Sequence, residues 1–192
     1  MAPQYRITSD ELIKTLTAWD ELIPGREKIH LIACGGTALT LLGYKPSTVD
    51  VDFLVPVQGE YKRLTAFLKE AGYEQIGGHR WKRPDEILLF DLFAGNSVFT
   101  TALLDSPLEP GKNRKIREFK KIYLGVLNSI DLIITKLFRG TSVDMDDCKL
   151  LLENESVNRA ELEERYKETA KYETGEEKVL RNLEVFLQRL KK

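Results

Sequence analysis

The strongest constraint on the fold is the order of apolar residues and glycines in the first third of the chain. A short apolar run at residues 29–33 leads into Gly35 and Gly36, which favours a buried strand followed by a tight turn. Residues 37–43 suit a short helix that ends at a glycine. Residues 49–55, VDVDFLV, alternate in polarity and are rich in β-branched residues, as is typical of a strand. This segment therefore predicts a mixed α/β architecture.

The rest of the chain first continues the mixture of strands and turns, and then changes to the apolar spacing of helices. Residues 79–93 and 114–127 are each predicted to form a hairpin, and 86–93 is expected to be a central strand. From Ser129 onward the apolar spacing is helical to the end of the chain. We therefore expect the α/β (α+β) class: a small mixed β-sheet flanked by helices, followed by a helical C-terminal part that packs on it. The expected boundaries are 1–127 for the core and 128–192 for the helical part.

Composition narrows the class of protein further. The chain has 192 residues, of which 42% are apolar and 31% charged, and its net charge of −1 gives no global field for nucleic acid. Cys34 and Cys148 have no partners at zinc-ligand spacing and cannot build a disulfide framework. The N-terminal MAPQYRITSDE lacks a signal-peptide pattern, and no apolar run reaches the ~20 residues that span a bilayer. A cytoplasmic protein is expected.

Two carboxylates lie one residue apart in the strand predicted at 49–55. Side chains alternate along a strand, so Asp50 and Asp52 point to one face while Val51 and Phe53 point to the other, into a core. Neighbouring carboxylates repel, and one tends to gain a proton unless a cation lies between them. Mg²⁺ is bound in this way by one or two carboxylates together with substrate phosphates. The pair therefore indicates a cation site.

The glycines before the helix complement this cation site. Gly35 and Gly36 have no Cβ, so a phosphate can approach the backbone N–H groups at the start of the helix, and Thr37 adds a hydroxyl. Each signal also has a plainer explanation, namely an ordinary turn and a solvated strand end. A third carboxylate, Asp91, lies between large apolar residues in ILLFDLF, where an unpartnered charge is costly. It is expected at an exposed strand end, in a salt bridge, or in a shared metal site.

Taken in order, these segments resemble a known family. The pattern GGTALTLLG…STVDVDF followed by LLFDLF is similar to the nucleotidyltransferase superfamily of the DNA polymerase β type. Within it, the chain most resembles small prokaryotic proteins related to the AbiEii-type abortive-infection toxins, which carry a Thr two residues before the first Asp, as Thr48 stands here. The later segment SIDLIITKLFRGTSVDMDD matches their second motif with Asp131, Lys136, Arg139, Asp144 and Asp147.

The resemblance implies roles for eight residues. The nucleotide phosphates would contact Gly35, Gly36, Thr37, Thr48 and Lys136. The catalytic and metal-binding residues would be Asp50, Asp52 and Asp91. Two Mg²⁺ ions are implied, with Mn²⁺ as an alternative. The implied reaction moves a nucleoside monophosphate from an NTP to an acceptor hydroxyl on tRNA, another RNA or protein, with a toxin-like role and an antitoxin-like partner.

Two departures from the family pattern keep other functions open. Many relatives have an Arg where this chain has Pro46, and another where it has Val143. These changes motivate a second hypothesis, a nucleotide-binding or partner-binding module without turnover. A glycosyltransferase is a third, since Asp-x-Asp can also hold a metal–nucleotide-sugar, although Gly35 and Gly36 would then be unexplained.

Several other residues allow two interpretations each. Lys136 is expected off the apolar face of its helix, either solvated or bound to phosphate. Asp144 and Asp147 are expected in the first turn of the next helix as structural caps. Trp81, among basic residues, either stacks on a base or is buried in its hairpin. The basic stretch 111–121 forms either a protected sheet edge or a surface for RNA.

Overall fold

A computed structural model describes residues 5–190, so four residues of the N-terminal stretch that lacks a signal pattern lie outside the described part. The helices of this part are α1 (Ser9–Leu22), α2 (Gly35–Leu41), α3 (Gln58–Glu70), α4 (Ser129–Arg139), α5 (Ser142–Asn154), α6 (Arg159–Ala170) and α7 (Glu176–Arg189). The strands are β1 (Ile29–Ala33), β2 (Asp50–Val55), β3 (Glu74–Gly77), β4 (Arg80–Lys82), β5 (Leu89–Ala94), β6 (Ser97–Val98), β7 (Thr101–Ala102), β8 (Asn113–Glu118) and β9 (Ile122–Leu127). Within residues 5–190, no helix combines the length and apolar character needed to cross a membrane.

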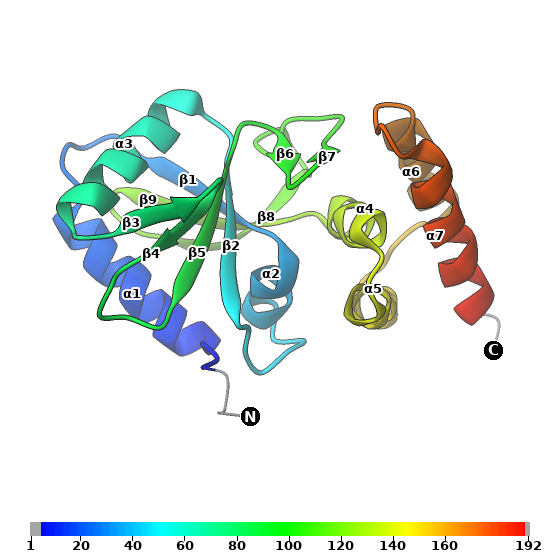
Figure 1. The fold of residues 1–192 in the computed structure, drawn as a ribbon, viewed down its shortest axis with the longest axis horizontal. Coiled ribbons are helices and arrows are strands. Elements are labelled where there is room, and N and C mark those ends of the chain that lie inside the picture. The colour runs from blue at the N-terminus through cyan, green and yellow to red at the C-terminus, as the bar shows by residue number, and fades with distance from the viewer. Residues whose placement is uncertain (1–4, 191–192) are drawn as a thin grey trace.

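A mixed seven-stranded sheet organises the first part of the chain. Its strand order is β3-β4-β5-β2-β1-β9-β8. Strand β2 runs parallel to β5 and antiparallel to β1, and β1 runs parallel to β9. Figure 1 shows α1 and α3 on one side of this sheet, and α2 with the C-terminal helices on the other. The predicted fold class, a mixed sheet flanked by helices with a helical C-terminal part, is confirmed.

The core on the α1 and α3 side is aromatic. Trp19 of α1 packs on Phe90 of β5 with ring centroids 4.7 Å apart, and its ring also contacts Phe67 and Tyr73 at 6.1 and 5.8 Å. All four side chains are at most 5% exposed. Because side chains alternate along a strand, the burial of Phe90 on this side places its neighbour Asp91 on the opposite side.

The helical part is attached to the other side of the sheet through α4. This helix contacts α2 as well as α5, α6 and α7. Its residues from Asp131 to Phe138 are all buried. The amide of Asn182 in α7 donates a hydrogen bond to the carbonyl of Leu137 at 2.8 Å, which fixes α7 against α4. The division of the chain into domains at residues 127 and 128 stays a prediction.

Most predicted elements are present, with three differences. The two predicted hairpins form as β4–β5 and β8–β9, but β5 begins only at Leu89. The edge strand β3 was not predicted, because residues 74–77 carry no buried side chain and hence no apolar alternation. The glycine pair does not form a separate turn, because α2 begins at Gly35 itself.

Candidate active site

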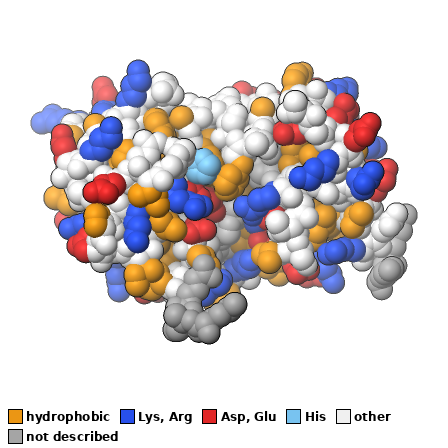
Figure 2. All heavy atoms as spheres, in the orientation of Figure 1, with side chains coloured by type: hydrophobic (Ala, Val, Ile, Leu, Met, Phe, Trp, Pro, Cys, Tyr) orange, Lys and Arg blue, Asp and Glu red, His pale blue; other side chains and the backbone are white. Residues whose placement is uncertain are grey.

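A cavity of about 440 Å³ lies where the sheet meets the C-terminal helices. Figure 2 shows cationic and anionic side chains close together in the hollow between the two parts of the molecule. The cavity is lined by Arg6, Gly36, Lys45, Ser47, Thr48, Val49, Asp50, Asp52, Arg80, Asp91, Phe99, Lys136, Arg139, Val143 and Asp147. Six of the eight residues predicted for the site therefore line one cavity; Gly35 and Thr37 lie behind it.

Strand register brings the three predicted carboxylates together. Asp52 of β2 is paired with Asp91 of β5, and Asp91 is paired in turn with Arg80 of β4. Paired residues on neighbouring strands point to the same face of a sheet. Asp50, two residues before Asp52, shares that face. The sheet therefore presents three carboxylates and one guanidinium side by side at the cavity.

Asp52 is the more deeply buried of the two carboxylates, Asp50 and Asp52, that have no partner among residues 5–190. Its residue is 7% exposed, and among residues 5–190 its carboxylate has neither a hydrogen-bond donor nor an ion-pair partner. Burial, with the negative charge of Asp91 as the next cause, raises its pKa from 3.8 to about 7. The pKa of Asp50 is raised for the same two reasons. An unpartnered buried carboxylate facing a cavity is a ready ligand for a cation.

The glycine pair is required by these strand residues. Gly35 has φ of +57°, and a Cβ placed on it would lie 2.1 Å from Oδ2 of Asp52. A Cβ on Gly36 would lie 2.6 Å from Oγ1 of Thr48. Both values are shorter than any real contact of a Cβ atom. The glycines therefore allow α2 to begin directly against the polar side chains of the neighbouring segment.

The two predicted threonines hold the carboxylate strand. The Thr37 hydroxyl donates to the carbonyl of Asp50 at 3.2 Å and accepts from the N–H of Asp52 at 2.9 Å. Thr37 is fully buried, so its hydroxyl reaches the strand backbone rather than the cavity. The Thr48 hydroxyl donates to the same Asp50 carbonyl at 3.0 Å, and Thr48 lines the cavity.

Asp91 forms a salt bridge, one of the three alternatives that its sequence context allowed. Nε of Arg80 lies 3.1 Å from its Oδ1, and Nη2 of Arg80 lies 3.4 Å from its Oδ2. Nε2 of His79 lies 3.9 Å from Oδ1. Asp91 is 2% exposed, whereas the Arg80 side chain is 44% exposed and borders the cavity. Arg80 is one of the basic residues around Trp81, and nothing in the sequence indicates that it pairs with Asp91.

Lys136 is buried in an ion pair, and this bears on its two interpretations. Its side chain is 2% exposed, so of its two interpretations the solvated lysine is excluded. Its Nζ lies 2.7 Å from a carboxylate oxygen of Asp147, whose other oxygen lies 2.6 Å from Nζ of Lys45. Asp147 lies beyond the first turn of α5, which begins at Ser142, so it is not a cap. The role of Lys136 towards phosphate stays a prediction.

Asp144 is the structural cap that the sequence predicted. It forms a capping box with Thr141 at the start of α5. Its carboxylate also accepts hydrogen bonds from Arg139, with Nε 2.9 Å from Oδ2. These contacts outweigh its burial and lower its pKa. Arg139 is thereby fixed at the cavity wall.

The cavity lining also contains an aromatic residue that the sequence did not indicate. Phe99, between β6 and β7, has φ of +52°, which is strained for a side chain of this size. Its ring lies 4.7 Å from that of Phe93, 5.2 Å from that of His79, and 5.4 Å from the guanidinium carbon of Arg139. By contrast, Trp81 is 1% exposed, so of its two interpretations the buried hairpin residue is confirmed and base stacking is excluded.

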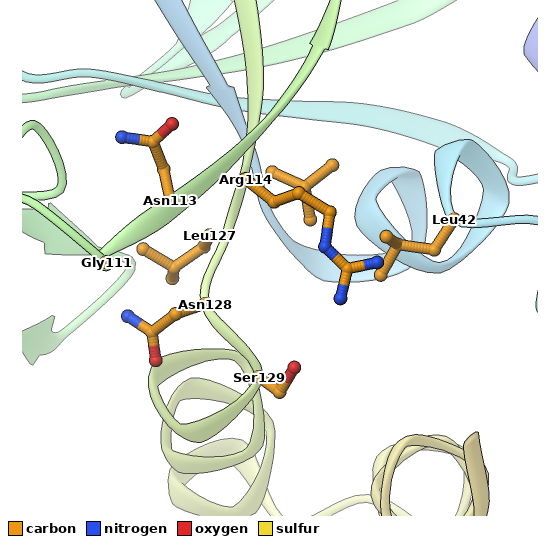
Figure 3. Close-up of a pocket in the computed structure, with 8 residues that line it drawn as sticks. Leu42, Gly111, Asn113, Arg114, Leu127, Asn128 and Ser129 are labelled. Atoms are coloured by element: carbon orange, nitrogen blue, oxygen red, sulfur yellow. The ribbon is translucent and has the colours of Figure 1, made fainter. Parts of the chain in front are cut away.

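A smaller cavity of about 160 Å³ lies beside β8 and the start of α4, with Arg114 extending across it toward Leu42 (Figure 3). Its amide side chains are used within the protein. Asn113 donates to the carbonyl of Pro107 at 2.6 Å, and Asn128 accepts from the N–H of Asp131 at 3.0 Å. This cavity offers no unsatisfied charged group, whereas the carboxylate cavity combines unpartnered carboxylates with cationic side chains and is the candidate active site.

Comparison with known proteins identifies the fold. No family model and no curated protein matches the chain. Among solved structures, ANT(2″)-Ia in complex with adenylyl-2″-tobramycin matches with 16% identity and a TM-score of 0.54, over 85% of this chain and 97% of that one. A solution structure of ANT(2″)-Ia matches with 18% identity and a TM-score of 0.45, over 95% of this chain and 92% of that one. A candidate nucleotidyltransferase from H. pylori matches with 15% identity and a TM-score of 0.47, over 93% of this chain and 80% of that one. The chain has the fold of a nucleotidyltransferase.

Proposed function

We propose that this protein is a metal-dependent nucleotidyltransferase that moves a nucleoside monophosphate from an NTP to an acceptor hydroxyl. The observation that carries the proposal is the Asp52 carboxylate, which is buried, lacks a partner among residues 5–190 and faces the cavity. A side chain of this kind is costly unless a ligand completes it. The nucleotidyltransferase fold supports the same reaction class.

The donor set fits a hard divalent cation. Asp50 and Asp52 share one face of β2, and carboxylate oxygens are the ligands that Mg²⁺ and Mn²⁺ prefer. The raised pKa values of both residues are also what such a cation would reverse, because it favours the ionised form. When bound, the metal would act as a Lewis acid that polarises the phosphoryl oxygens of the nucleotide and neutralises part of their charge.

The surrounding cations suit a triphosphate. Five lysines and arginines line the cavity against four aspartates. Arg6 and Arg139 are both exposed there, and the Arg6 guanidinium is oriented by hydrogen bonds to Ser47 at 2.9 and 3.0 Å. Guanidinium groups bind phosphate oxygens in a fixed geometry. The nucleotide phosphates would accordingly lie between these cations and the backbone at Gly36, with Thr48 beside them.

The acceptor is proposed only as a hydroxyl compound. The solved complex of ANT(2″)-Ia contains an adenylylated aminoglycoside, which supports a hydroxyl acceptor for this fold. The burial of Trp81 removes one reason to favour RNA. The tRNA and protein acceptors, the toxin-like role and the antitoxin-like partner stay predictions.

The test is transfer of label from [α-³²P]NTPs in the presence of Mg²⁺ or Mn²⁺. Acceptor pools would be tRNA, a protein extract and a set of aminoglycosides. We expect label transfer by the wild type and its loss in Asp52→Asn, which keeps the size of the side chain and removes its charge. Asp146→Asn, at an exposed position on α5, is the matched control and should transfer normally. Transfer by Asp52→Asn at the wild-type rate would refute the assignment. Binding of NTP without transfer to any pool would favour the non-catalytic module.

A further inference from the structure

We propose that Arg80 takes the place of a second divalent cation, so that the centre binds one metal ion per nucleotide rather than two. This inference rests on the proposed function and concerns the same cavity. It differs from the resemblance to the polymerase-type family, which implies two Mg²⁺ ions shared among Asp50, Asp52 and Asp91.

The contact between Arg80 and Asp91 occupies both oxygens of the third carboxylate. Nε and Nη2 of Arg80 lie 3.1 and 3.4 Å from Oδ1 and Oδ2, which is a two-point contact. The His79 ring nitrogen lies on the same side, 3.9 Å from Oδ1. A metal ion that used Asp91 as a ligand would have to displace this guanidinium or share the carboxylate with it.

The position of Arg80 is fixed by the sheet rather than by a flexible loop. Arg80 and Asp91 are paired residues on β4 and β5, and Asp91 and Asp52 are paired residues on β5 and β2. The guanidinium therefore follows the carboxylates in one row across three strands. Asp50 and Asp52 also act on Arg80, because their charges contribute, after that of Asp91, to raising its pKa.

Charge balance favours one metal ion. Asp50, Asp52 and Asp91 carry three negative charges when ionised, which one divalent cation and one guanidinium neutralise. The nearby cations Lys136 and Arg139 do not replace Arg80, because each is already paired with its own carboxylate, at 2.7 Å from Asp147 and 2.9 Å from Asp144 respectively. Asp50 and Asp52 are left to bind the metal.

The experiment counts bound metal directly. Mn²⁺ bound per protein is measured by electron paramagnetic resonance in the presence of non-hydrolysable α,β-methylene NTPs, with protein-free samples as the baseline. We expect one Mn²⁺ per nucleotide complex in the wild type and two in Arg80→Gln, where the freed Asp91 becomes a ligand. Arg80→Lys, which keeps the charge, should remain at one.

The matched control is Arg83→Gln, which removes an arginine of the same hairpin that pairs with Asp85 and Glu86 and has a similarly exposed side chain, 43% against 44%. It should remain at one Mn²⁺. If Arg80→Gln folds poorly, Asp91→Asn gives a second measurement: at saturating Mn²⁺ it should still bind one ion through Asp50 and Asp52, with weaker affinity because Arg80 has lost the carboxylate that neutralises it. Two ions in the wild type, or loss of the ion in Asp91→Asn, would overturn the role of Arg80 and leave the proposed function intact. Absence of both nucleotide and Mn²⁺ from the wild type would overturn both.

Discussion

Asp52 should make the protein less stable as the pH rises, and Asp52→Asn should remove much of that dependence. The pKa of Asp52 is raised from 3.8 to about 7 in the folded protein, so between these values the folded state holds a proton that the unfolded state has released. Stability therefore falls as the pH rises through this window and stays low above it. At 1.36 kcal/mol per pKa unit, the full loss is about 4 kcal/mol, of which about 2–3 kcal/mol falls between pH 5 and pH 8.

Urea unfolding at pH 5 and pH 8, without divalent metal, tests this prediction. The wild type should lose about 2–3 kcal/mol more than Asp52→Asn over this interval, equivalent to roughly 5–10 °C in melting temperature for a chain of this size. Asp50 titrates in the same direction and will leave a smaller residual slope in the variant. Asp146→Asn should follow the wild type. If Asp52→Asn also follows the wild type, Asp52 is not the strained carboxylate that the site requires.

Two further substitutions test how the site is built. Gly35→Ala combines a positive φ with a Cβ that would lie 2.1 Å from a carboxylate oxygen, whereas Gly43→Ala has a positive φ but open space. Gly35→Ala should therefore lower the free energy of unfolding in urea by about 1–3 kcal/mol more than Gly43→Ala. Equal losses of stability in the two variants would contradict the close approach. Lys136→Met should lower the free energy of unfolding by about 3 kcal/mol, which is at the low end for a broken buried ion pair because Lys45 still contacts Asp147. Lys149→Met, at an exposed position, should change stability by less than about 0.5 kcal/mol. A similarly small loss for Lys136→Met would show that its charge is not needed in the fold.

The sequence is most informative where the spacing of apolar residues and the positions of turn-forming residues indicate the same element. The alternation of residues 49–55 places Asp50 and Asp52 on one face of β2. That Asp91 meets them depends in addition on the register between β2 and β5. The apolar spacing after Ser129 likewise predicts the helical part that α4 to α7 form. These features depend on local periodicity, which a single sequence records.

What the sequence could not give were the partners of buried charges. Lys136 lies off the apolar face of α4, where the sequence alone gives no reason for burial. It is buried because α5 packs against this side and brings Asp147 to its ammonium group. The pairing of Arg80 with Asp91 depends on the register between β4 and β5, which no local pattern fixes. The sequence predicts that Gly35 gives a phosphate access to the backbone, whereas in the structure the atom nearest to a Cβ at this position belongs to the carboxylate of Asp52.

The central claim is that Asp50 and Asp52 form a metal site that receives the phosphates of a nucleotide. The most direct test is a crystal structure with Mn²⁺ and a non-hydrolysable NTP, using anomalous scattering to locate the metal. We expect Mn²⁺ within coordination distance, about 2.2 Å, of carboxylate oxygens from both residues, with the triphosphate against Gly36. A nucleotide bound with its metal elsewhere, or with neither carboxylate as a ligand, would contradict it.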